Sequence, residues 1–71
     1  MEQATVYRWN SRNGSGVLTR SDGPPAWFHV SSVEAGDVLA LEEGDQVDAE
    51  VENVPQGDYE CRAVFVRKHL P

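Results

Sequence analysis

The chain has 71 residues, a formal net charge of −6 at pH 7 and one cysteine. A chain this short buries only about 60% of the surface that its unfolded form exposes, so its core is small and leaves no room for a wide catalytic cleft. The single cysteine, Cys61, excludes an internal disulfide, and the negative charge argues against tight, non-specific binding of phosphate backbones. We therefore expect one small domain over residues 1–71 that is not an enzyme and acts through its surface.

The cellular location is predicted from what the sequence lacks. The first five residues, MEQAT, are not a basic segment followed by an apolar run, so we expect no signal peptide. No apolar stretch approaches the roughly 20 residues that cross a bilayer. A secreted domain of this size would usually need disulfides or a metal. These observations favour a cytoplasmic, monomeric protein that does not contact membranes.

Charge is distributed unevenly between the two halves of the chain. Three arginines against two acids give residues 1–33 a net charge of +1, whereas three cations against ten acids give residues 34–71 a net charge of −7. The first half can therefore present a neutral or basic face. We interpret the acidic half as a solvated surface that keeps the protein soluble, and a protein-binding surface is the alternative.

Three strands with short connections are predicted in the first half. β-branched and aromatic residues favour a strand over residues 5–10, and the dipeptide Asn13-Gly14 after it favours a hairpin because both residue types tolerate a positive φ. The sequence DGPP at residues 22–25 predicts a second turn, since prolines cannot donate to a β-ladder. The predicted strands are residues 5–10, 15–20 and 26–31.

The second half predicts two more strands after an irregular, acidic connection over residues 32–45, which Leu39 and Leu41 are available to pin down. Residues 46–53 alternate strictly, with Val47, Ala49 and Val51 on one face and acids on the other. Residues 59–67 form the fifth predicted strand. Three strands, a long connection and two strands indicate an all-β fold, a small five-stranded antiparallel Greek-key barrel.

The outer face of the first three strands is the candidate binding surface. We assign Val6, Leu18 and Phe28 to the core, and we place Arg8, Ser15, Val17, Trp27 and His29 on the outside; the face of Trp9 is left open. An outward tryptophan beside an outward histidine, near arginines, is typical of a platform on which nucleic-acid bases stack. The alternative is that Trp27 covers a gap in a thin core.

The same segments resemble the cold-shock domain. VYRWN at residues 6–10 resembles the opening V-K-W-F-N of that family, NGSGVL at 13–18 resembles its first binding motif K-G-F-G-F-I, and WFHVS at 27–31 resembles its second, F-V-H-F-S. LEEGDQV at 41–47 resembles L-x-E-G-Q-x-V, which leads into the fourth strand of the family. The resemblance covers most of the chain and implies an oligonucleotide-binding fold, a barrel of five strands.

The resemblance implies binding of single-stranded DNA or RNA, with RNA-chaperone or regulatory work in a bacterial cytoplasm. The family stacks bases on aromatic rings at four positions that are held here by Arg8, Ser15, Val17 and Val30, so weak binding is expected. A guanidinium can stack on a base, which makes the loss at Arg8 partial. The predicted nucleic-acid-binding residues are Arg8, Trp9, Asn10, Arg12, Ser15, Val17, Trp27, His29 and Val30. The alternative is a degenerate member of the family that acts through protein–protein interaction.

Other sites are not predicted. The run Gly14-Ser15-Gly16 lacks the following Lys-Ser and the helix of a phosphate-binding loop, so a hairpin turn is favoured. The spacing of His29, Cys61 and His69 fits no common zinc pattern. No Ser-His-Asp arrangement is readable, and the carboxylates are expected on solvated surfaces. We therefore expect no metal, no cofactor and no catalytic residue.

Overall fold

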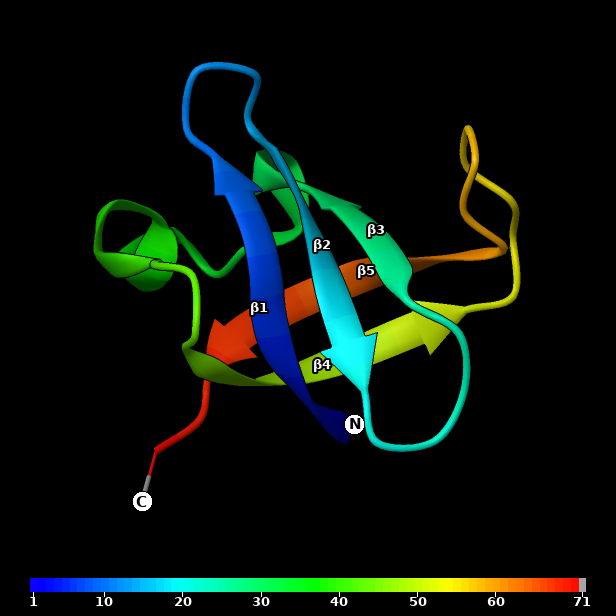
Figure 1. Ribbon diagram of the computed structural model, residues 1–71. Helices are drawn as coiled ribbons and strands as arrows, with labels where there is room; N and C mark the ends of the chain where they lie inside the picture. Colours follow the sequence, from blue (N-terminus) through cyan, green and yellow to red (C-terminus); the bar gives the residue numbers. More distant parts are fainter. Residues whose placement is uncertain (71) are drawn as a thin grey trace.

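A computed structural model describes residues 1–70, in which five strands close into a barrel in the order β1-β2-β3-β5-β4 (Figure 1). The elements in chain order are β1 (Glu2–Asn10), β2 (Ser15–Arg20), β3 (Ala26–His29), the 3-10 turns η1 (Val30–Ser32) and η2 (Ala35–Ala40), β4 (Gln46–Glu52) and β5 (Cys61–Lys68). The predicted five-stranded all-β barrel is confirmed. No helix within residues 1–70 has the length and apolar character needed to cross a membrane.

The strand ladders differ in direction at one place. The β1–β2, β2–β3, β1–β4 and β4–β5 ladders are antiparallel, but β3 and β5 run parallel and pair only at Ala26↔Cys61 and Trp27↔Arg62. The fifth strand begins at Cys61 rather than at residue 59, because Tyr59 pairs with Gln56 in the preceding loop. The third strand ends at His29 rather than at residue 31, because η1 begins at Val30, and the first strand begins at Glu2 rather than at residue 5.

The connection after β3 is held by one leucine and not by two. Leu41 is buried, whereas Leu39 in η2 is fully exposed, so the expectation that both leucines pin this segment is wrong for Leu39. In a 3-10 turn residues three apart share a side, which turns Val38 and Leu41 together toward the core and leaves Leu39 outside. The backbone N–H of Glu34 also donates to the carbonyl oxygen of Val66 at 2.8 Å.

A β-bulge in β1 decides which side chains face outward. Val6 pairs with Leu18 and Arg8 pairs with Val17, so Tyr7 is an extra residue in its strand. Strict alternation from the buried Val6 would turn Arg8 inward, but the bulge shifts the pattern by one residue and leaves both Tyr7 and Arg8 exposed. The predicted outward position of Arg8 is therefore confirmed, but alternation from Val6, on which the prediction rests, does not explain it; the bulge is its cause.

The core lies inside the barrel, and the predicted inward residues Phe28, Leu18 and Val6 are its largest fully buried side chains. The cluster consists of Ala4, Val6, Leu18, Phe28, Val33, Leu41, Val47, Ala49, Ala63 and Val66. Gly16 is required for the close approach of β1 and β2 over this core. A Cβ atom there would lie 2.5 Å from the carbonyl oxygen of Arg8 and 2.7 Å from the ring of Phe28.

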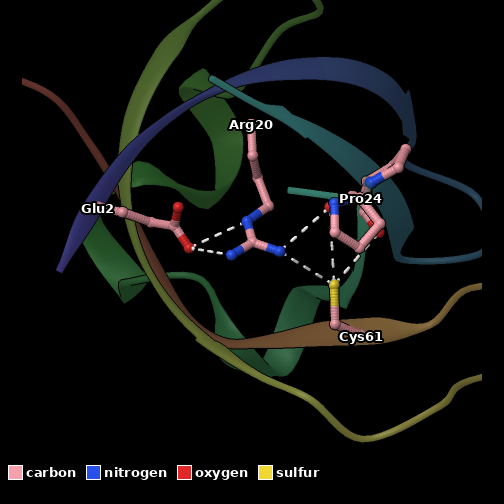
Figure 2. Close-up of polar contacts among 5 residues, drawn as sticks. Glu2, Arg20, Pro24 and Cys61 are labelled. Atoms are coloured by element: carbon pink, nitrogen blue, oxygen red, sulfur yellow. Dashed lines mark hydrogen bonds and ion pairs between the residues drawn. The ribbon is translucent and has the colours of Figure 1, made fainter. Parts of the chain in front are cut away.

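One end of the barrel is closed by a polar network around Arg20, the last residue of β2 (Figure 2). Its Nε and Nη2 donate to the same carboxylate oxygen of Glu2, at 3.0 and 2.9 Å, and its Nη1 donates to the carbonyl oxygen of Pro24 at 3.2 Å. The thiol of Cys61 lies 3.4 Å from Nη1 and donates to the carbonyl oxygen of Pro25 at 3.3 Å. The network therefore joins the ends of β1, β2 and β5 to the β2–β3 loop.

Candidate nucleic-acid interface

Two aromatic side chains of β3 form a platform on the outer surface of the barrel. The ring centroids of Trp27 and His29 are 6.2 Å apart, and their planes are inclined by 28°. Neither residue belongs to the core cluster, His29 is exposed and Trp27 is half-buried. On β2 their ladder partners are Val17 and Ser15. The predicted outward placement of Trp27 and His29 is confirmed, and the alternative that Trp27 completes the core is not supported.

The hydrogen bonds of His29 fix which ring nitrogen carries the proton. Its Nδ1 accepts from the backbone N–H of Ser31 at 3.1 Å and lies 2.9 Å from the hydroxyl oxygen of the same residue. Because a backbone N–H only donates, Nδ1 of the neutral ring is unprotonated and the proton lies on Nε2. His29 therefore offers a donor at Nε2 beside the face of Trp27, on a ring that is held in one orientation.

An open groove of about 580 Å³ runs along Trp27 and crosses three strands. Its walls come from β1, β2 and β3, from the β1–β2 loop, from the connection before β4 and from the β4–β5 loop. Of the predicted residues, the groove brings together Arg8, Trp9, Asn10, Arg12, Ser15, Val17 and Trp27. His29 and Val30 lie outside its lining, so the groove and the platform meet at Trp27.

Val17 and Val30 are less accessible than the resemblance implies. Val17 faces outward and lies outside the core cluster, yet only 6% of it is exposed, so it forms the covered floor of the groove. Val30 is the first residue of η1 and packs on the hairpin loop, where a Cβ atom at Gly14 would lie 3.0 Å from its Cγ1. Its N–H donates to the carbonyl oxygen of Gly14 at 2.6 Å. Neither side chain is a free stacking surface.

Trp9, whose face the sequence left open, belongs partly to the core. Its ring lies parallel to that of Phe28, with an interplanar angle of 4° and a centroid distance of 5.5 Å. The bulge at Tyr7 produces this orientation, because it makes Trp9 the partner of Gly16 on the inner side. One face of Trp9 is occupied by Phe28, so only the remaining exposed part of its ring contributes to the groove.

Asn10 shapes the hairpin loop that carries Arg12. Its side-chain oxygen accepts from the backbone N–H groups of Arg12 and Asn13, at 3.0 and 3.2 Å. Gly14 alone in this loop has a positive φ, of 68°, and its N–H donates to the carbonyl oxygen of Asn10 at 2.9 Å. The predicted hairpin is confirmed, and it is a four-residue loop closed by a side chain. Asn10 therefore positions Arg12 at the rim of the groove.

The groove carries charges of both signs. Arg8 and Arg12 line it and are exposed, and the guanidinium carbon of Arg8 lies 5.6 Å from the centroid of the Tyr7 ring. Against them stands Glu43, whose carboxylate accepts from the backbone N–H of Trp9 at 3.1 Å. A carboxylate here repels phosphates, which lowers the electrostatic attraction that the arginines provide.

Sequence reasoning missed Glu43 and Tyr59, which line the same groove as Trp27. Glu43 reaches β1 from 34 positions away, through contacts between the connection and the bulge. Tyr59 arrives because β5 pairs with β3, which places residue 61 opposite residue 26. No local sequence pattern signals either contact. Within residues 1–70, no three histidine, cysteine or acidic side chains are grouped so that they could hold a metal ion.

Comparison with known proteins identifies the family. No family model matches the chain. The chain is 34% identical over 68 residues to cold shock protein CspC of Bacillus subtilis, which covers 96% of this chain and 98% of that protein. It is 30% identical over 64 residues to cold shock protein 1 of Lactiplantibacillus plantarum, an alignment that covers 90% of this chain and 97% of that protein. It is 32% identical over 57 residues to the major cold shock protein of Streptococcus pyogenes, an alignment that covers 80% of this chain and 85% of that protein. With this similarity and a closed five-stranded barrel, the chain belongs to the cold-shock protein family.

Proposed function

We propose that this protein binds single-stranded DNA or RNA, weakly, on the outer face of β1, β2 and β3. The observation that carries the proposal is the pair of outward rings, Trp27 and His29, whose centroids are 6.2 Å apart. Flat aromatic faces stack on bases of any sequence. Arg8 and Arg12 lie in the adjoining groove, where they can meet phosphates. Membership of the cold-shock family supports the same class of ligand.

The weakness follows from the missing rings. Ser15, Val17 and Val30 occupy three positions where the family resemblance implies aromatic stacking, and each stack contributes roughly 1–3 kcal/mol. Taking the lower half of that range, three lost stacks remove roughly 3–6 kcal/mol, or about two to four decades of affinity. We expect a dissociation constant on the order of 10 μM to 1 mM at low salt for a pyrimidine-rich strand of about six to eight bases.

We further propose that this weak, sequence-tolerant binding serves RNA-chaperone or regulatory work by a monomer in the cytoplasm. The alternative of protein binding through the acidic half gains no support from the structure. The carboxylate of Asp45 accepts from the backbone N–H of Glu42 at 2.9 Å and lies 3.4 Å from the ammonium nitrogen of Lys68. The carboxylate of Glu43 accepts a hydrogen bond from the backbone N–H of Trp9. These carboxylates hold the connection to the barrel.

Tryptophan fluorescence tests the proposal without a label. A Trp9→Phe background keeps a ring against Phe28 and leaves Trp27 as the sole tryptophan, so quenching reports stacking on Trp27. Titration with a short pyrimidine-rich strand at low salt should quench this fluorescence with the weak constant given above. Trp27→Ala, followed by oligonucleotide NMR or calorimetry, should weaken binding about 5- to 150-fold without unfolding the protein. Equal binding by Trp27→Ala would contradict the proposal.

A further inference from the structure

The groove extends beyond the three strands that carry the recognised motifs. Tyr59, in the β4–β5 loop, lines it together with Trp27 and Val17. Tyr59 is half-buried and does not belong to the core cluster, so the core does not account for its position. In Figure 1 this loop, drawn in yellow and orange, projects from the barrel before β5 returns beneath β3. An aromatic ring from the acidic half of the chain therefore reaches the candidate site.

The backbone holds Tyr59 in place. The N–H of Gln56 donates to the carbonyl oxygen of Tyr59 at 2.9 Å, and the N–H of Tyr59 donates to the carbonyl oxygen of Gln56 at 3.0 Å. Gly57 makes this tight turn possible with a φ of 59°. Two residues later Cys61 pairs with Ala26 and anchors the loop to β3. Because the backbone of Tyr59 is already ordered, base stacking on its ring costs less conformational entropy than it would on a disordered loop.

We propose that Tyr59 is a stacking residue of this site and takes a base next to the one on Trp27, an inference that rests on the proposed function. It supplies one aromatic surface to a groove whose β2 wall has only Ser15, Gly16 and Val17. Its neighbours Asp58 and Glu60 are exposed acids, which repel phosphates and so favour contact by a base over contact by the backbone. The phosphates lie toward Arg8 and Arg12, which line the same groove from β1 and from the β1–β2 loop.

Two substitutions separate the ring from the rest of the side chain. Tyr59→Leu removes the aromatic face and keeps apolar bulk, whereas Tyr59→Phe keeps the ring and removes the hydroxyl. In the Trp9→Phe background, Tyr59→Leu should weaken binding of a pyrimidine hexanucleotide about 5- to 150-fold, and Tyr59→Phe should change it less than about threefold. The salt dependence should be the same in both variants, because a stack neutralises no phosphate.

Proton NMR of the unsubstituted protein provides a readout that does not depend on how a variant folds. The ring protons of Tyr59 should shift upfield as the hexanucleotide is added, over the concentration range in which Trp27 is quenched in the Trp9→Phe background. Unchanged Tyr59 resonances, or equal binding by Tyr59→Leu while Trp27→Ala binds poorly, would overturn the role of Tyr59 and leave the proposed function standing. Absence of binding in both the unsubstituted protein and its Ser15→Phe, Val17→Phe form would overturn both proposals.

Discussion

Arg8 and Arg20 lie on neighbouring strands and have opposite surroundings. Arg20 directs four contacts at three partners, Glu2, Pro24 and Cys61, and its side chain is 14% exposed. Arg8 is exposed, forms no ion pair within residues 1–70, and lies over the Tyr7 ring. Contacts within the fold occupy most donors of Arg20 (Figure 2), whereas no ion pair or hydrogen bond within residues 1–70 occupies the guanidinium of Arg8. The same residue type thus stabilises one end of the barrel, while on the outer face it is available for the nucleic-acid binding that we propose.

Substitution of Arg20 should have the largest effect, and it should act on stability alone. Arg20→Met removes charge-assisted hydrogen bonds and leaves the Pro24 carbonyl and the Glu2 carboxylate without their donor. Since hydrogen bonds to charged groups contribute about 1.5–3 kcal/mol, the free energy of unfolding should fall by about 2–3 kcal/mol in urea denaturation. Affinity for the oligonucleotide should stay unchanged when it is measured below the midpoint of unfolding.

A matched control is Arg67→Met on β5. Arg67 lies 3.7 Å from Asp48, and its side chain is 47% exposed. Exposed ion pairs contribute little, so this variant should lose less than about 0.5 kcal/mol. Equal losses in the two variants would show that the Arg20 network has no special role in closing the barrel.

Substitution of Arg8 should show the reverse pattern. Arg8→Met keeps an apolar stem and removes the exposed guanidinium over Tyr7, so stability should change by less than about 0.5 kcal/mol. Affinity should fall about 5- to 10-fold at low salt, and the slope of log K against log salt should become shallower by about 0.7, the value for one phosphate of a single strand. An unchanged slope would mean that Arg8 meets no phosphate.

Glu43→Gln should have a smaller effect of opposite sign. The amide oxygen of the new side chain can still accept from the N–H of Trp9, so the local structure is kept while one negative charge leaves the groove. Affinity should rise about two- to threefold at low salt, and this gain should disappear near 1 M salt. Glu42→Gln is the control, because Glu42 does not line the groove; an equal gain there would indicate a general effect of net charge.

The smallest expected effect concerns pH. The pKa of Arg20 is raised above its ordinary value. The hydrogen bond to Glu2 is the largest cause, burial lowers the pKa in part, and the charge of Glu2 raises it further. A cation whose folded pKa is raised contributes stability that is fully present below its ordinary pKa and lost only as the pH rises through the folded value. The difference in unfolding free energy between wild type and Arg20→Met should therefore stay within about 0.5 kcal/mol from pH 6.5 to 8.5. A steady decline across that window would contradict this assignment.

The barrel could be predicted because its signals are local. The hairpin loop, the alternation at Val47, Ala49 and Val51, and the apolar residues Val6, Leu18 and Phe28 each follow from neighbouring residues. Val51 is only partly buried, since the ladder shifts at this point of β4. Periodicity alone did not distinguish Leu39 from Leu41, because the outcome depends on the 3-10 geometry of η2.

The site was only half predictable because it depends on contacts between distant residues. Trp27 and His29 could be placed by alternation from Phe28. The extra residue at Tyr7, which sets the orientations of Arg8 and Trp9, has no sequence signature of its own. Glu43 and Tyr59 enter the groove through the packing of the connection and of β5, at sequence distances that no local pattern spans.

The central claim is that the outer face of β1–β3 is a nucleic-acid site weakened by its missing rings. The most direct test restores them with Ser15→Phe and Val17→Phe in the Trp9→Phe background, with Trp27 quenching by a pyrimidine hexanucleotide as the readout. Each added ring should raise affinity about 5- to 150-fold, so the double variant should bind in the micromolar range or below. If neither the parent nor the restored form quenches Trp27 at low salt, this face is not a nucleic-acid site and the account is wrong.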